Sequence, residues 1–194
     1  MSEVSKFLGH KVGEIISLTS LNIIMEHEVT ELNMKISEVR EYKTEDGNLN
    51  YTGYVCSPES DDEAPYMLLV RQVGDVWDML LTYLQVHGSI EQAGEVVLTE
   101  EGDDLTDEFY IPITDVNGNE EDVMWTQKDS GTIFGVLIDD EIKTTAEYQT
   151  SSDVGGYQHG FLEWTGDDAV GYVEFWIGMP ISEHDVKFLS GEIL

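Results

Sequence analysis

Apolar and polar residues alternate along most of this 194-residue chain, and a period of two is typical of β-strands with one buried face. Clusters of glycine, proline, asparagine and aspartate separate the alternating stretches and predict turns. Helices are expected to be few and short. The pattern predicts strands at residues 12–21, 34–43, 49–56, 66–73, 76–85, 95–99, 107–114, 123–127, 132–138, 142–150, 157–164 and 171–179.

Residues 76–85 fit two patterns. Trp77, Leu80 and Leu84 follow a helical stripe, whereas Trp77 and Met79 begin one face of a strand. We predict a strand, because the neighbouring segments are themselves expected to be strands.

The hairpin formed by residues 157–164 and 171–179 is the clearest of the chain, because an alternating apolar face begins at Val173. After this hairpin, Ser182 can cap a last short helix that contains Val186. The last part of the chain is therefore expected to form a short helix.

A segment of the chain occurs twice. Residues 41–66 align without a gap on residues 147–172, and seven of the 26 positions are identical, where average composition gives about two. The identities are Glu41/Glu147, Tyr42/Tyr148, Thr44/Thr150, Tyr51/Tyr157, Asp61/Asp167, Asp62/Asp168 and Tyr66/Tyr172. This repeat predicts that residues 34–73 and 140–179 are two copies of one antiparallel unit.

These patterns predict a mainly β fold, or a β-rich α+β fold with few short helices, in which antiparallel sheets from two related halves form a sandwich or a partly open barrel. Residues 1–94 are expected to form the first β-rich half, and residues 131–194 the second. Residues 95–130 are expected to be an acidic connecting segment with short strands. The three parts are expected to form one compact unit.

Charge is the most unusual feature of the composition. Forty Asp and Glu against nine Lys and Arg give a net charge of −31 and a pI near 4.1. Such a surface repels nucleic acid and anionic lipid, and it attracts basic proteins or cations. Two explanations remain open, namely solubility or adaptation to high salt, and a direct electrostatic role such as imitation of a DNA phosphate array.

The sequence predicts a cytoplasmic protein. Residues 1–14 lack a basic start followed by an apolar stretch, so no signal peptide is expected. No apolar run approaches the roughly 20 residues that a membrane span needs. Cys56 is the single cysteine, so an intrachain disulfide is impossible.

Metal and cofactor motifs are absent from the sequence, and we predict neither a metal site nor a cofactor. The five histidines show no zinc-binding spacing, and no phosphate loop or dinucleotide fingerprint occurs. Residues 115–122 alternate oxygen ligands as a calcium loop does, but the glycine is displaced and Thr126 stands where a bidentate glutamate belongs. A plain turn explains this segment better.

One catalytic alternative remains. If a four-residue turn joins the last hairpin, His159 lies across from Glu174, with Tyr157 and Glu163 on the same face. Such a cluster can polarise a proton-transfer site, although a polar cross-strand pair explains the same residues.

Two acidic turns fall at equivalent places in the repeat and form the candidate partner-binding site. Turn chemistry explains much of this acidity, because aspartate tolerates turn conformations. The functional alternative is a pair of acidic tips that a basic partner contacts. The candidate residues are Glu59, Asp61, Asp62, Glu63, Asp167 and Asp168.

The C-terminal third carries Tyr-Val-Glu-Phe-Trp at residues 172–176 and Gly-Met-Pro-Ile-Ser-Glu-His-Asp-Val at residues 178–186. On these motifs it resembles a bacterial family of unknown function. Genes of that family often lie beside those of phage-shock, ESCRT-III-like membrane-remodelling proteins and spermidine-synthase-like proteins. The resemblance covers about the last 45 residues and, through the repeat, part of residues 34–73. It implies an accessory or adaptor role and assigns no catalytic residue.

The sequence therefore predicts a non-catalytic, strongly acidic interaction protein that binds a basic protein partner and does not bind nucleic acid directly. The first alternative is a phage-type DNA mimic that inhibits a nucleic-acid-binding enzyme. The second is an enzyme with a site at His159 and Glu174.

We predict that the melting temperature rises as salt increases over the first few hundred millimolar. An excess of 31 negative charges disfavours the compact state through self-repulsion, and counterions screen that repulsion. Thermal melts in a non-binding salt measure the effect. A flat or falling melting temperature would show that bound cations or internal pairs already compensate the carboxylates.

Overall fold

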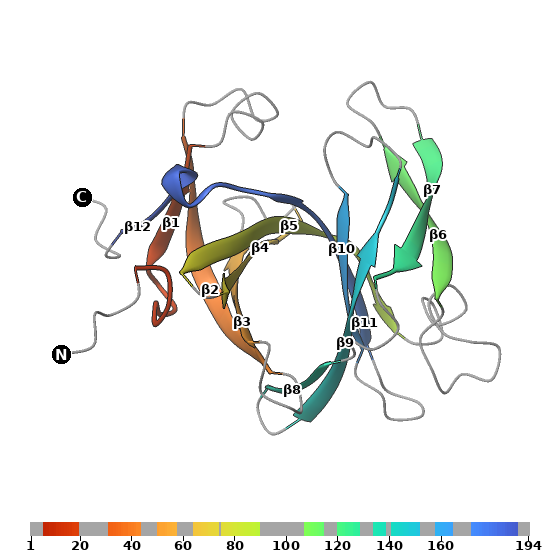
Figure 1. Ribbon diagram of the computed structural model, residues 1–194, viewed down its shortest axis with the longest axis horizontal. Coiled ribbons are helices and arrows are strands. Elements are labelled where there is room, and N and C mark those ends of the chain that lie inside the picture. Colours follow the sequence, from red (N-terminus) through yellow and green to blue (C-terminus); the bar gives the residue numbers. More distant parts are fainter. Residues whose placement is uncertain are drawn as a thin grey trace.

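The computed structural model (Figure 1) describes residues 6–19, 31–43, 50–57, 64–73, 75–89, 107–114, 120–128, 134–138, 141–151, 158–164 and 172–189. About three quarters of these residues (76%) belong to antiparallel strands, which confirms the mainly β fold. The strands are β1 (Ile15–Leu18), β2 (Leu32–Lys43), β3 (Asn50–Ser57), β4 (Tyr66–Val73), β5 (Val76–Ser89), β6 (Glu108–Thr114), β7 (Glu120–Gln127), β8 (Phe134–Ile138), β9 (Glu141–Gln149), β10 (His159–Trp164), β11 (Tyr172–Pro180) and β12 (Val186–Leu189).

All twelve described strands belong to one sheet, which is strongly curled. Its order is β12-β1-β2-β3-β4-β5-β11-β10-β9-β7-β6, and β8 pairs with β9 beside β7. The curl brings β8 against β2, so the central strands surround an interior (Figure 1). The sequence leaves open a sandwich or a partly open barrel. The structure has a single curled sheet and not the two stacked sheets of a sandwich. Strands from all three predicted segments contribute to this sheet.

Two apolar clusters cover the outer face of the central strands. One lies where β1, β12 and the segment around Phe7 pack on β2 to β5, and it includes Ile16, Tyr54 and Leu68. The other lies where the β6–β7 hairpin folds over β9, β10 and β11, and it centres on Trp125. In Figure 1 these two flanking parts lie at opposite sides of the central strands.

A third cluster fills the middle of the interior. Successive residues of β4 show the alternation, because Met67 and Leu69 belong to this inner cluster whereas Leu68 and Val70 belong to the outer one. Both faces of β4 are therefore buried. The inner cluster contains Tyr42, Tyr51, Val55, Met67, Leu69, Phe161 and Trp176.

An irregularity in β2 determines which of its side chains face the interior. The pairing of β2 with β3 shifts by one residue between Ile36 and Glu38. Ile36, before the shift, packs in the outer cluster, and Tyr42, after it, packs in the inner cluster. In a regular strand these two residues would share a face, because they are six positions apart. A bulge residue exchanges the two faces of a strand, so Arg40 turns inward with Tyr42.

The ambiguous segment at residues 76–85 is a strand, as predicted, and forms the first part of β5. The predicted C-terminal helix is wrong. Ser182 caps only one 3-10 turn, Glu183–Asp185, and its hydroxyl accepts a hydrogen bond from the His184 amide at 3.3 Å. The chain then continues as β12, because pairing with β1 satisfies its backbone groups and buries Val186.

The two segments of the repeat have the same strand order, since β2-β3-β4 and β9-β10-β11 are both consecutive antiparallel neighbours. Their registers differ from the gapless alignment. Tyr42 pairs with Tyr51, but the equivalent Tyr148 pairs with Gly160, which lies three residues beyond Tyr157. Tyr157 itself lies outside the described residues. An origin by duplication stays a prediction, and the structural equivalence requires an insertion in the hairpin loop.

No helix among the described residues has the length and apolar character that crossing a membrane requires.

Candidate functional site

Three inward-facing residues of β10 divide the interior into layers. His159, Phe161 and Glu163 alternate with Gly160 and Leu162, which face the outer cluster. Glu163 belongs to a buried ionic network, Phe161 to the inner apolar cluster, and His159 to a small pocket. The interior therefore has a charged group at each end and an aromatic layer between them.

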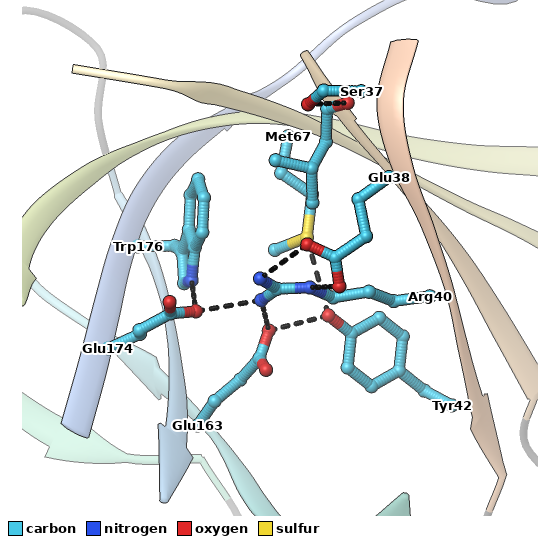
Figure 2. A network of polar contacts seen from close by, with 9 residues as sticks. Ser37, Glu38, Arg40, Tyr42, Met67, Glu163, Glu174 and Trp176 are labelled. Atoms are coloured by element: carbon cyan, nitrogen blue, oxygen red, sulfur yellow. Dashed lines mark hydrogen bonds and ion pairs between the residues drawn. The ribbon is translucent and has the colours of Figure 1, made fainter. Parts of the chain in front are cut away.

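The network at the first end is built around the guanidinium of Arg40 (Figure 2). Its Nη1 donates to Glu163 Oε1 at 2.9 Å and to Glu174 Oε2 at 2.7 Å. Its Nε and Nη2 donate to the two carboxylate oxygens of Glu38 at 2.8 and 3.1 Å. Arg40 is 6% exposed and Glu163 is 2% exposed, so the central pair of this network is shielded from solvent.

Aromatic residues complete the network. Tyr42 donates its hydroxyl to Glu163 Oε1 at 2.5 Å, and Trp176 Nε1 donates to Glu174 Oε2 at 3.3 Å (Figure 2). The Arg40 guanidinium also lies 5.7 Å from the centre of the Trp176 ring, within the range of a cation–π interaction. Burial and the carboxylate of Glu163 raise the pKa of Tyr42 far above its usual value, so it acts as a hydrogen-bond donor.

The charge state of Arg40 is fixed by its partners. Burial alone lowers the pKa of a guanidinium, but the carboxylates of Glu163, Glu38 and Glu174 outweigh burial and raise the pKa of Arg40. A permanently charged group whose N–H groups make four bonds to carboxylates is suited to holding strands together. It ties β2 to β10 and β11 across the interior.

The middle layer is aromatic. Phe161 packs edge-on against Tyr42 at a centroid distance of 5.1 Å and against Tyr51 at 6.4 Å. Trp176 lies directly opposite Phe161 in the β10–β11 register. This layer separates the Arg40 network from the charged group at the other end.

The second charged group surrounds a pocket between β3, β4, β5, β9 and β10. Arg71 on β4 forms an ion pair with Asp78, its partner on β5, and lies 4.7 Å over the Tyr51 ring. Tyr51 donates its hydroxyl to Glu147 on β9, and burial together with the Glu147 carboxylate raises the pKa of Tyr51. Lys128 Nζ reaches Glu147 Oε2 at 3.6 Å.

His159 lines this pocket and is half-buried. Burial and the nearby ammonium of Lys128 lower its pKa, and this outweighs the opposite effect of Glu147 and Asp78. The imidazole is therefore neutral at pH 7. Neither ring nitrogen has a hydrogen-bond partner in the described part of the chain.

The predicted pairing of His159 with Glu174 is wrong. His159 lies opposite Gly178, whereas Glu174 lies opposite Glu163, because the hairpin loop is longer than the four residues assumed. The aromatic layer therefore separates the two residues of the catalytic alternative. Glu174 helps to hold Arg40, and His159 faces the pocket.

The six acidic turn residues proposed for partner binding, Glu59, Asp61, Asp62, Glu63, Asp167 and Asp168, lie outside the described residues. They stay a prediction. No group of three or more His, Cys, Asp or Glu within the described residues is arranged to hold a metal ion.

Sequence reasoning missed both arginines, although a signal existed. Arg40 and Arg71 are the only arginines of the chain, and each follows apolar strand residues in a protein with few cations. An arginine placed inside a strand predicts a buried carboxylate partner. The buried partners of Arg40, Glu163 and Glu174, come from strands far along the chain, so the sequence could not identify them.

Replacing Arg40 with methionine should lower the free energy of unfolding by about 3–5 kcal/mol, because Glu163 and Glu174 would lose their shared cation in a buried site. The double variant Arg40→Met/Glu163→Gln should regain part of that loss. Urea unfolding at pH 7 measures both. Arg71→Met, which removes the more exposed arginine, is the matched control and should cost less. A loss below about 1 kcal/mol for Arg40→Met would contradict the structural role.

The lowered pKa of His159 predicts a loss of stability in acid. The unfolded chain takes up a proton on this residue near pH 6.5, whereas the folded protein does so only at lower pH. The free energy of unfolding should therefore fall as the pH drops below about 6.5, and His159→Gln should lose this component. The variant His184→Gln, on the exposed turn before β12, is the control. NMR titration of the His159 ring gives its pKa directly, and a value above 6.5 would contradict the assignment.

Comparison with known proteins gives no relative for this chain. No protein-family model, no curated protein and no solved structure matches it. Its function must therefore be argued from its own geometry and charge.

Proposed function

We propose that this protein is a non-catalytic binding protein whose acidic surface docks a basic protein partner. The distribution of charge supports this role. Both arginines face the interior and are paired with carboxylates, so they do not offset the acidic exterior. The resemblance of the C-terminal third to a family of unknown function implies an accessory or adaptor role, which points in the same direction.

One observation carries the proposal, and it concerns the outer face of the β6–β7 hairpin. Tyr110 is 60% exposed and Met124 is 37% exposed, and the two lie directly opposite each other in the β6–β7 register. The Tyr110 hydroxyl lies 3.3 Å from the Met124 sulfur. The other face of the same hairpin is buried in the outer apolar cluster. The exposure of these two side chains is therefore not the result of a missing core.

Carboxylates surround this exposed pair. Glu108 lies two residues from Tyr110 on β6, Asp122 lies two residues from Met124 on β7, and Glu120 follows at the strand start; all three are exposed. Neither strand contains lysine or arginine. Tyrosine and methionine are enriched at the centres of protein interfaces, and charged rims accelerate encounter. The surface therefore suits a partner with an apolar patch ringed by basic residues.

The partner should dock on the face of the hairpin, not along its edge. β6 ends the described strand order, and the Asp107 carbonyl accepts from the Gln127 amide at 2.7 Å. By the antiparallel pattern, Pro112 then lies at a position whose backbone points away from β7. Proline supplies no amide there, and its carbonyl accepts from Gln85 Nε2 at 3.2 Å. The edge is thus blocked for strand addition at its centre.

The test is a pull-down from an extract of the source organism, compared between two test variants and one control variant. Tyr110→Ser and Met124→Ser should lose a basic protein that the wild type retains, and increasing salt should release that protein. Tyr172→Ser, which removes a tyrosine of similar exposure (55%) on β11, is the matched control and should retain it.

Surface neutralisation then tests the rim. The combined change Glu108→Gln, Glu120→Gln and Asp122→Asn should slow association with the recovered partner by about tenfold at low salt, and by less at high salt. Equal capture by the Tyr110 and Tyr172 variants would refute the docking face. Recovery of a nucleic-acid enzyme bound through its basic groove would favour the DNA-mimic alternative.

A further inference from the structure

The sulfur-containing side chains of this protein differ sharply in their access to solvent. Met124 on β7 is 37% exposed, whereas the other methionines among the described residues are buried. The buried ones are Met34, Met67, Met79 and Met179, each at most 4% exposed. A thioether is oxidised by a peroxide that reaches its sulfur, so Met124 is the methionine of this set that the folded protein offers to an oxidant.

The single cysteine does not compete with Met124 for oxidants. Cys56 is buried in the outer apolar cluster around Ile16, and burial raises the pKa of its thiol to about 12. The group is therefore a thiol at pH 7, and the thiolate is the form that reacts with peroxides. Within the described part of the chain, Met124 is thus the sulfur most open to oxidation.

The surroundings of the Met124 sulfur suit both the reaction and its product. The Tyr110 hydroxyl donates to this sulfur at 3.3 Å, and it is near enough to donate to a sulfoxide oxygen, a stronger acceptor than the thioether. The exposed carboxylates of Glu108 and Asp122 on the same face repel anionic oxidants. Hydrogen peroxide is uncharged and is not repelled, so it is the class of oxidant that this face admits.

Given the docking function proposed above, we propose that Met124 is a reversible oxidation site through which peroxides weaken the docking face of the β6–β7 hairpin. An S–O bond forms at Met124 while the O–O bond of hydrogen peroxide breaks. The sulfur loses two electrons, and the peroxide is reduced to water. A methionine sulfoxide reductase reverses the change with two thiols, which become a disulfide, and the oxygen leaves as water.

The effect on docking follows from the polarity of the product. A sulfoxide is polar and chiral, whereas the thioether is a flexible apolar group. Tyr110 and Met124 form the apolar centre of the docking face, and the surrounding side chains are acidic. Oxidation therefore removes half of that centre and leaves the charged rim as it was.

Oxidation by hydrogen peroxide, followed by peptide mass spectrometry, tests the site itself. Met67 is the matched comparison, because the Tyr42 hydroxyl lies 3.3 Å from its sulfur as well, but Met67 is buried. Met124 should be oxidised at least about tenfold faster than Met67, which becomes accessible only when the structure opens. In denaturing urea the two rates should converge. Equal rates in the folded protein would overturn the proposal.

The pull-down described above tests the effect on docking. Wild-type protein treated with peroxide should capture about tenfold less partner than untreated protein, and treatment with a mixture of the two epimer-specific reductases should restore capture. Met124→Leu keeps an apolar side chain that peroxide does not oxidise, so peroxide should not change the amount that this variant captures. Met179→Leu, the same change at a buried methionine, should respond to peroxide as the wild type does.

The proposal fails if the oxidised wild type captures as much partner as before, or if peroxide lowers capture by Met124→Leu. If Met124→Leu captures too little to measure, the time course in the wild type decides, because loss of capture must follow the appearance of the Met124 sulfoxide. Absence of any captured protein with the untreated wild type would refute the docking function instead. The oxidation rates of Met124 and Met67 do not depend on that outcome.

Discussion

Burying a guanidinium is costly unless carboxylates pair with it, and Arg40 pairs with three. Two of them, Glu163 and Glu174, come from β10 and β11, on the far side of the interior from β2. Each carboxylate alone would be costly to bury, and each is stabilised by the same cation. Tyr42 and Trp176 use their polar atoms to bind this network, so these two members of the aromatic layer depend on it for hydrogen bonds.

The network also explains how a chain with such a high net negative charge can bury acidic residues in its interior. Most of its acidic residues can remain hydrated, but those on the inner face cannot, and the two arginines are placed with them. The exterior is left with a charge that repels other acidic molecules. The two arginines thus pair with inner carboxylates and leave the exterior strongly acidic.

The strand pattern could be read from the sequence to a large extent. The segments 66–73 and 76–85 are strands where alternation and turn residues predict them, and the mainly β fold follows. The helix expected after Ser182 is a strand, because pairing of Val186–Leu189 with β1 overrides the local capping signal. Local signals cannot foresee a pairing between the two ends of a chain.

The candidate sites were harder to predict, and the reason is geometric. His159 and Glu174 share a hairpin, but their partnership depends on the loop length, which the alternation of strand residues leaves undetermined. Arg40 faces inward only because the register of β2 shifts after Ile36. A period of two predicts two faces for a strand but not which residue exchanges them.

That shift gives the position of Ser37 an importance that its side chain does not have. Ser37 hydroxyl donates to the Val55 carbonyl at 3.1 Å, a contact that many residues could do without. If Ser37 instead paired in the regular ladder, every later residue of β2 would change face, so that Val39 and Glu41 would turn towards the interior and Arg40 towards solvent. Whether Arg40 can reach Glu163 and Glu174 therefore depends on the bulge at this position more than on the serine side chain.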